Sequence, residues 1–161
     1  NREEEPLWPA GYPKPLTRNA YECSIRYRNH NCQPICQGFV KDTQEQAQIT
    51  EIFRKGWIGE KVGDSICFEV EGSGVAVQYR KSVKQPACTA VAVVDGREED
   101  AILLDGNFEE DWGDCLYLQS LVTHGEYKMH KVEITVKDGK VGETVPFYLV
   151  SVIVSKEVQD K

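Results

Sequence analysis

The sequence predicts an all-β fold, an antiparallel β-sandwich of the jelly-roll kind with little helix. Apolar and polar residues alternate in 66–70, 75–79 and 132–136, as they do in strands with one buried face. Turn residues separate the apolar runs at roughly the 8–12-residue spacing of a sandwich. The only helix-start signal lies before 46–52, where the apolar pattern is thin.

Residues 1–20 are expected to form a linker, and residues 21–161 a single β-sandwich domain. No apolar period develops in the first segment, which holds four closely spaced prolines, Pro6, Pro9, Pro13 and Pro15. Proline at this density gives an extended, semi-rigid chain. The chain does not begin with Met, so we expect it to be a piece of a longer protein.

The first predicted strands flank the tight turn Gly72-Ser73-Gly74. The segments 66–70 and 75–79 on either side of it predict a hairpin with one wet face and one buried face. The β-branched run 89–94 predicts the next strand, which ends at the turn pair Asp95-Gly96.

The second half of the chain predicts four further strands, over 101–104, 116–122, 132–136 and 147–154. The last of these is apolar almost throughout, which indicates a central strand buried on both faces. We therefore expect about seven or eight strands in all.

Size and charge limit the possible partners. The 161 residues, with a mass of 18.2 kDa, suffice for one domain with its own core. There are 26 acidic and 19 basic residues, for a formal net charge of −7. This sign opposes binding to nucleic acid or to an anionic membrane surface. No run approaches the ~18 apolar residues of a membrane span. We therefore expect neither a nucleic-acid nor a membrane partner.

The cysteines favour reduced thiols over a disulfide scaffold. The chain has six: Cys23, Cys32, Cys36, Cys67, Cys88 and Cys115. The last three lie in or beside strand-like runs, where cysteine behaves as a small hydrophobe. Cys32 and Cys36, with Cys23 and His30 nearby, would make half of a zinc site, but the other half is missing. We expect a cytoplasmic location and no metal; a disulfide near 23–36 and secretion are the alternatives.

The stretch 105–114 is the most distinctive of the chain, with five carboxylates and Asn107 around two aromatic residues. Its start matches the first, third and fifth positions of an EF-hand calcium loop. Glu110 stands where that loop needs glycine, and Leu116 where it needs a bidentate carboxylate, so the motif fails. A calcium site without the EF-hand pattern, of the kind found in β-sandwiches, remains as the alternative.

The same stretch suggests a contact surface. Trp112 would stack on a sugar ring or a partner side chain, while neighbouring polar groups bind hydroxyls. The basic stretch 79–86 would pair with these acids, face an acidic partner or remain solvated. The candidate ligand-binding residues are Trp112, Asp111, Asp114, Asn107 and Arg80. The alternative is a solvated loop whose Trp112 folds back onto the core. Trp57 is expected in the core or at a strand start, and Trp8 against a neighbouring domain.

The tetrapeptide Gly63-Asp64-Ser65-Ile66 is similar to the nucleophile block of the GDSL, or SGNH, hydrolases. Here it leads into a strand, and Gly-Asp-Ser is a favourable turn at such a place. A nucleophilic serine needs a base within hydrogen-bond reach. None of the three histidines has an acid three residues before it, as the family's Asp-x-x-His requires. We predict no catalytic residue, with a hydrolase using Ser65 as the weaker alternative.

A wider pattern resembles the β-sandwich accessory domain of many bacterial SGNH/GDSL-type hydrolases, a group that includes lipases and carbohydrate esterases. It is carried by Gly56-Trp57, by 63–80 (GDSICFEVEGSGVAVQYR) and by 104–108 (LDGNF), and it covers 50–154. The family's catalytic blocks have no matching set here, so no catalytic residue is carried over. The proline-rich start then fits a linker after an N-terminal catalytic domain.

The resemblance implies a non-catalytic module, without a cofactor, of an esterase that acts on acylated carbohydrate. The module would dock on the catalytic domain of the same polypeptide or help to position the carbohydrate substrate. The alternative is an independent carbohydrate-binding module with a polysaccharide as its partner. A docking role predicts that Trp112 and Tyr117 are covered by another domain. The oligomeric state is not predicted.

Overall fold

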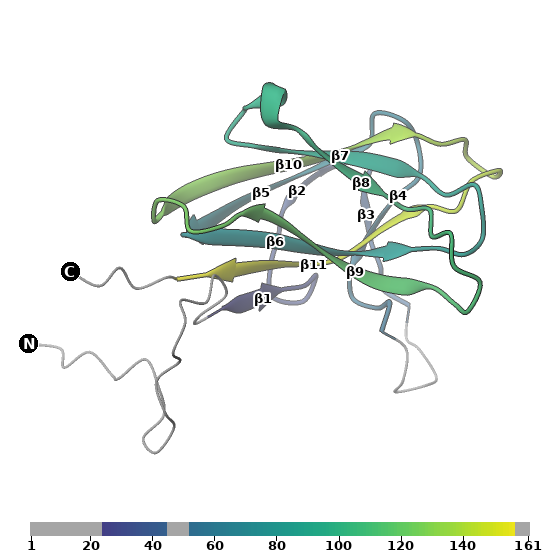
Figure 1. Ribbon diagram of the computed structural model, residues 1–161, viewed down its shortest axis with the longest axis horizontal. Coiled ribbons are helices and arrows are strands. Elements are labelled where there is room, and N and C mark those ends of the chain that lie inside the picture. Colours follow the sequence, from purple (N-terminus) through teal and green to yellow (C-terminus); the bar gives the residue numbers. More distant parts are fainter. Residues whose placement is uncertain (1–23, 45–51, 157–161) are drawn as a thin grey trace, which may run out of the picture.

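The computed structural model describes residues 24–44 and 52–156 as two antiparallel sheets packed face to face (Figure 1). The six-stranded sheet has the order β3 (Val40–Lys41), β4 (Trp57–Gly59), β11 (Phe147–Ser155), β6 (Gly74–Lys81), β9 (Cys115–Val122), and β1 (Ile25–Tyr27) also pairs with β11. The five-stranded sheet has the order β2 (Ile35–Gln37), β5 (Ser65–Gly72), β10 (Lys128–Asp138), β7 (Thr89–Val94), β8 (Ile102–Asp105).

The predicted fold class is confirmed. Within the described ranges there is no α-helix, only the 3₁₀ turn η1 (Glu98–Asp100). None of the described helices is long and apolar enough to cross a membrane. The predicted linker, Trp8, Cys23 and nearly all of the predicted helix over 46–52 lie outside the described residues.

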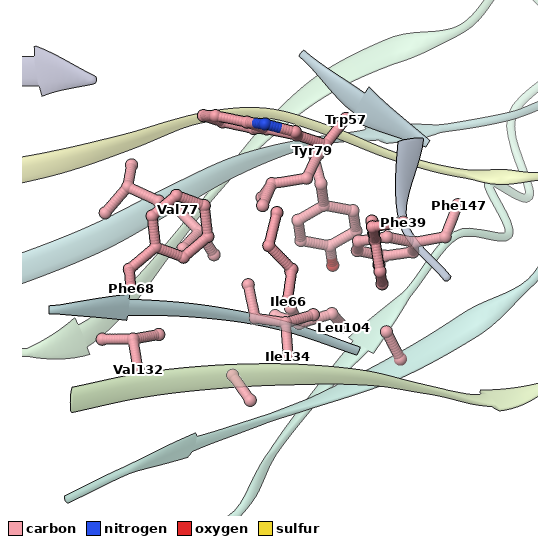
Figure 2. Packing of buried hydrophobic residues seen from close by; sticks show 14 of the residues in the cluster. Phe39, Trp57, Ile66, Phe68, Val77, Tyr79, Leu104, Val132, Ile134 and Phe147 are labelled. Carbon is pink, nitrogen blue, oxygen red and sulfur yellow. The ribbon is translucent and has the colours of Figure 1, made fainter. Parts of the chain in front are cut away.

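The core forms where the inward faces of the two sheets meet, as Figure 2 shows. The Trp57 ring of β4 contacts the Phe68 ring of β5 edge-on, with centroids 5.2 Å apart, and so joins the two sheets. Tyr79 of β6 stacks on Phe147 of β11 at 5.4 Å within the six-stranded sheet. Trp57 is 2% exposed, which places it in the core at the start of a strand, as predicted.

The predicted hairpin is wrong, although both of its strands exist. β5 pairs with β10 and β2, whereas β6 pairs with β11 and β9, so the chain crosses between the sheets at Gly72-Ser73-Gly74. The Ser73 amide donates to the Ser155 carbonyl at 2.9 Å. A Cβ added at Gly72 would lie 2.5 Å from Val154 Cγ1. The glycine therefore permits a tight corner between sheets rather than a turn within one.

The last strand was predicted correctly as central. β11 pairs with β6 on one side and with β4 and β1 on the other, and it is buried along almost its whole length. The described chain has more strands than the seven or eight expected, because β1 to β4 span only two or three residues each. Such short strands carry too little alternation to be seen in the sequence.

The sandwich has two different ends. At the Trp112 end, the connections 82–88, 106–114 and 139–146 join β6 to β7, β8 to β9 and β10 to β11. At the His130 end, β5 turns into β6, β7 into β8 and β9 into β10. Strand β1 begins and strand β11 ends at this second end.

Candidate functional site

Trp112 projects from the connection between β8 and β9. Its side chain is 70% exposed, and its ring meets the Phe108 ring edge-on, with centroids 5.4 Å apart. It does not fold back onto the core, which was the alternative expectation. An exposed indole supported by a second aromatic ring offers an apolar face to a ligand.

Asn107 fixes the base of this connection. Its Oδ1 accepts from the Ala87 amide at 2.8 Å, and its Nδ2 donates to the Ala87 carbonyl at 3.2 Å and to Asp105 Oδ1 at 2.8 Å. The side chain thus pairs with the Ala87 backbone as a neighbouring strand would. These bonds occupy the groups predicted to bind sugar hydroxyls, so Asn107 acts in this structure as a support for the loop.

The stretches 79–86 and 105–114 contact each other through backbone groups and the Asp114 carboxylate, which is a different kind of contact from the predicted pairing of cations with acids. The Ser82 amide donates to the Gly106 carbonyl at 2.8 Å, and the Phe108 amide donates to the Ser82 carbonyl at 2.9 Å. Asp114 Oδ1 accepts from the Val83 amide at 3.0 Å. Asp114, like Asn107, holds the two loops together, whereas Asp111 is exposed beside Trp112.

A polar hollow of about 330 Å³ lies beside these loops. It is lined by Lys81, Gln85, Asp105, Asn107, Phe108, Glu109 and Glu110. Beside the hollow, the Lys81 ammonium lies 4.3 Å from the centroid of the Tyr117 ring and makes a cation–π contact with it. Sequence reasoning left Lys81, Gln85 and the two glutamates out of the candidate list. If the alternation of 75–79 is extended by two residues, Lys81 falls on the same face of the strand as Tyr79 and on the opposite face from Arg80.

Arg80 lies apart from this site. It alternates with the buried Tyr79 and so points to the outer face of the six-stranded sheet. There its guanidinium lies 5.4 Å from the centroid of the Tyr148 ring and donates to the Pro146 carbonyl at 2.9 Å. Of the five predicted residues, the structure brings Trp112, Asp111, Asp114 and Asn107 into one loop but leaves Arg80 on another surface.

Metal-ligating groups do not converge in the part of the chain that the structure describes. There, no group of three or more His, Cys, Asp or Glu side chains could hold a metal ion. Asp105 Oδ1, the first position of the EF-hand match, accepts from the Asn107 amide at 2.9 Å. The five described cysteines are free thiols, and burial raises the pKa of Cys32, Cys36 and Cys67.

Ser65 does not lie beside the His130–Asp95 pair, in which Nδ1 and Oδ2 are 2.8 Å apart. It pairs with Thr135 of β10, whereas His130 pairs with Val70. Five residues of strand separate the two positions by about 16 Å. Asp64 Oδ2 accepts from the Glu60 and Lys61 amides at 3.2 and 3.0 Å, which supports the interpretation of Gly-Asp-Ser as a turn.

Comparison with solved structures adds the decisive similarity. A two-domain esterase active on acetylated mannans, co-crystallised with mannopentaose, matches 93% of this chain at 51% identity, with a TM-score of 0.85. A second structure of such an esterase matches 98% of the chain at 50% identity, also with a TM-score of 0.85. The chain is similar, over almost its whole length, to part of a two-domain esterase. The predicted resemblance to a β-sandwich domain of an ester hydrolase is thereby confirmed.

The match covers only part of those esterases. This chain spans 41% of the first esterase chain and 42% of the second. A family two carbohydrate esterase from Cellvibrio japonicus is 11% identical, with a TM-score of 0.57, over 81% of this chain and 33% of its own.

A carbohydrate-binding domain shares the fold as well. The CBM36-1 domain of a multidomain xylanase from the hindgut metagenome of Trinervitermes trinervoides is 10% identical, with a TM-score of 0.52, over 81% of this chain and 94% of its own. These last two similarities show a shared fold. No protein-family model and no curated protein sequence matches the chain.

Proposed function

We propose that the chain is the non-catalytic β-sandwich module of an SGNH/GDSL-type esterase, which docks on the catalytic domain and helps to position an acylated polysaccharide. The similarity to a two-domain esterase over 93% of the chain carries this proposal. That esterase is described as active on acetylated mannans, so acetylated mannan is the first substrate to test.

The Trp112 end supports a role in holding carbohydrate. Trp112, with the Phe108 ring against it edge-on, presents an apolar surface, and the hollow beside it is lined by the carboxylates of Glu109 and Glu110, which can accept hydrogen bonds from hydroxyls. Exposed carboxylates at Glu109, Glu110 and Asp111 favour an uncharged glycan over an acidic one, since like charges repel.

The test is tryptophan fluorescence of the isolated chain, titrated with acetylated and deacetylated manno-oligosaccharides and with other plant and bacterial glycans. We expect a saturable shift in fluorescence, and we expect Trp112→Ala to lower the affinity for the glycan by about tenfold or more. Tyr127→Ala is the matched control, because Tyr127 is also an exposed aromatic, 44% accessible, but lies at the His130 end. Equal weakening in both variants would contradict a site at Trp112.

The second candidate function is an independent carbohydrate-binding module, favoured by the solvent exposure of Trp112 in the chain alone. The two functions differ in what the isolated chain does. An independent module binds glycan without the catalytic domain. The proposed docking module binds glycan more weakly by itself, and it raises ester hydrolysis when joined to that domain. Both functions would be contradicted if neither the isolated chain nor the chain joined to the catalytic domain bound glycan, and if ester hydrolysis were the same with and without the module.

A further inference from the structure

The hollow beside the loop 106–114 is rich in groups that accept hydrogen bonds. Three carboxyl groups line it, those of Asp105, Glu109 and Glu110. An ionised carboxylate accepts hydrogen bonds and donates none. The hydroxyls of a sugar can donate to these groups, but an acetylated position has lost its hydroxyl hydrogen and offers only acceptor oxygens. An acetyl group bound here therefore needs a donor from the protein.

Among the described residues that line this hollow, Lys81 is the only cation. The side-chain amide of Asn107 already donates to two acceptors at the base of the loop, and Gln85 Nε2 donates to the Phe108 carbonyl at 3.1 Å. Within the described part of the chain, no carboxylate forms an ion pair with the Lys81 ammonium. This ammonium, with three N–H groups, is therefore the charged donor that a ligand in the hollow can meet.

An aromatic ring holds the Lys81 ammonium beside the hollow. Lys81 is the last residue of β6, on the same face as the buried Tyr79, and it pairs with Cys115 at the start of β9. Its Nζ lies 4.3 Å from the centroid of the Tyr117 ring, and Tyr117 is 39% exposed. The cation–π contact positions the ammonium without engaging it with a hydrogen-bond acceptor. The exposed part of the same ring is an apolar surface next to the donor.

The surrounding charges favour a neutral acceptor over an anionic one. A glycan carboxylate that approached Lys81 would also meet the exposed Glu109 and Glu110, and like charges repel. A neutral carbonyl oxygen avoids this repulsion. It still accepts a hydrogen bond from a charged donor, which is stronger than a hydrogen bond between two neutral groups. An ammonium beside an apolar ring thus matches the two parts of an acetyl group, its carbonyl and its methyl.

We propose that Lys81 makes this site selective for acetylated positions of the glycan: its ammonium donates to the acetyl carbonyl oxygen, and the acetyl methyl lies against the Tyr117 ring. This inference rests on the function proposed above and adds to it the residue that recognises acetylation. Unsubstituted positions are bound through their hydroxyls, by Glu109 and Glu110. The module then holds the esterase on stretches of polysaccharide that still carry acetyl groups and releases stretches that have lost them.

Isothermal titration calorimetry of the whole chain, with manno-oligosaccharides of one length, tests this selectivity. We expect the native chain to bind the acetylated oligosaccharide about tenfold more tightly than the unsubstituted one. Lys81→Met removes the ammonium but keeps an unbranched side chain, and it should bring this ratio of affinities to about one. Lys84→Met is the matched control, because it removes the same charge from an exposed position that does not line the hollow. It should leave the ratio unchanged.

O-methylated manno-oligosaccharides of the same length test the carbonyl without any change to the protein. A methyl ether blocks the hydroxyl as an acetyl ester does, but it has no carbonyl oxygen. The native chain should bind the methylated oligosaccharide no more tightly than the unsubstituted one. Equal affinities for the methylated and acetylated oligosaccharides would overturn the inference, and so would a ratio that Lys81→Met leaves unchanged. Circular dichroism of both variants separates a lost contact from a lost fold.

The outcomes also separate this inference from the proposed function. If the native chain binds the acetylated and unsubstituted oligosaccharides equally well, the role of Lys81 is overturned while the carbohydrate-holding role stands. If Lys81→Met weakens the binding of both equally, Lys81 supports binding in general, and the selectivity for acetyl groups is overturned. If neither oligosaccharide binds to the chain, alone or joined to the catalytic domain, the carbohydrate-holding role fails together with the inference.

Discussion

The two ends of the sandwich use their polar side chains in different ways. At the His130 end, the imidazole is only 3% exposed, with Nδ1 2.8 Å from Asp95 Oδ2 and Nε2 3.2 Å from the Glu126 carbonyl oxygen. At the Trp112 end, Asn107 and Asp114 hold the loops 82–88 and 106–114 together, while Trp112 projects into solvent.

The two ends of the sandwich therefore have different roles: polar contacts close one end, and at the other end they support a loop whose tryptophan is exposed. At the His130 end, the buried ring links β10 to the turn after β7. At the Trp112 end, the bonds of Asn107 hold the loop base, so the loop tip needs no contact with the core. Changes at the His130 end should therefore cost stability, and changes at the tip of the other end should affect binding.

The largest effect is expected at the corner between the sheets. Gly72→Ala should lower the free energy of unfolding by about 2–3 kcal/mol, because overpacking displaces neighbours. The added Cβ would lie 2.6 Å from the Ser155 carbonyl oxygen, a backbone atom. Urea unfolding measures this. Glu71→Ala, on the adjacent exposed position, should change little, and equal losses would show that the corner is not special.

The next effect concerns the buried imidazole. His130→Ala should cost about 2 kcal/mol, since it leaves the Asp95 carboxylate and the Glu126 carbonyl without their partner and opens a small cavity. Lys128→Ala removes only a surface cation 3.7 Å from Asp95 and should cost well under 1 kcal/mol. Thermal and urea unfolding distinguish the two variants. A harmless His130→Ala would refute the stabilising role of this end.

Asn107→Ala tests the supported base of the Trp112 end. Three hydrogen bonds are lost, two of them to the Ala87 backbone, so we expect a loss of about 1–2 kcal/mol. Asp111→Ala, at an exposed position of the same connection, should leave stability unchanged. If Asn107→Ala unfolded at the same urea concentration as the native chain, the loop base would not be fixed in the way described.

Acid should weaken the His130 end selectively. Partial burial raises the pKa of Asp95, but hydrogen bonds from the Lys131 amide and His130, with the charges of His130 and Lys128, lower it overall. A carboxyl with a lowered folded-state pKa adds stability above its unfolded pKa, about 3.9, and that stability is lost as pH falls through the folded value.

The stability difference between the native chain and Asp95→Asn should therefore shrink between about pH 5 and pH 2. Urea unfolding at a series of pH values measures it. A difference that stays constant over this range would contradict the assigned pKa shift.

The smallest effect on stability is expected at the exposed indole. Trp112→Ala should change the free energy of unfolding by less than about 0.5 kcal/mol, because the ring is mostly in solvent. The same variant is the one expected to lose glycan binding. A large loss of stability would mean that Trp112 supports the loop, and would remove the contrast between the two ends.

The sequence predicted single strands better than it predicted their partners. Alternation located β10 and the long apolar run located β11, because a strand buried on one face alternates apolar and polar residues and a strand buried on both faces is apolar throughout. It could not show that β5 and β6 lie in different sheets. A glycine-rich turn suits a hairpin and a corner equally, and the choice depends on contacts between Gly72 and distant Val154.

The candidate site was predicted in part for the same reason. The composition of 105–114 located Trp112 and Asp111 in an acidic loop, and the structure shows that both are exposed. Only the pairing with Ala87 and Val83 shows that Asn107 and Asp114 are engaged in holding the loops. Arg80 and Lys81 are neighbours in sequence, but strand alternation sends them to opposite faces, and Lys81 is the one beside the hollow.

By itself, the sequence determined the all-β class, the positions of the long strands and the acidic loop that contains Trp112, since each depends on local patterns of polarity. The tertiary structure decided which strands pair, which end His130 closes and which side chains of the loop remain available. Those outcomes depend on hydrogen bonds and close contacts between residues far apart in the chain, which local patterns do not record.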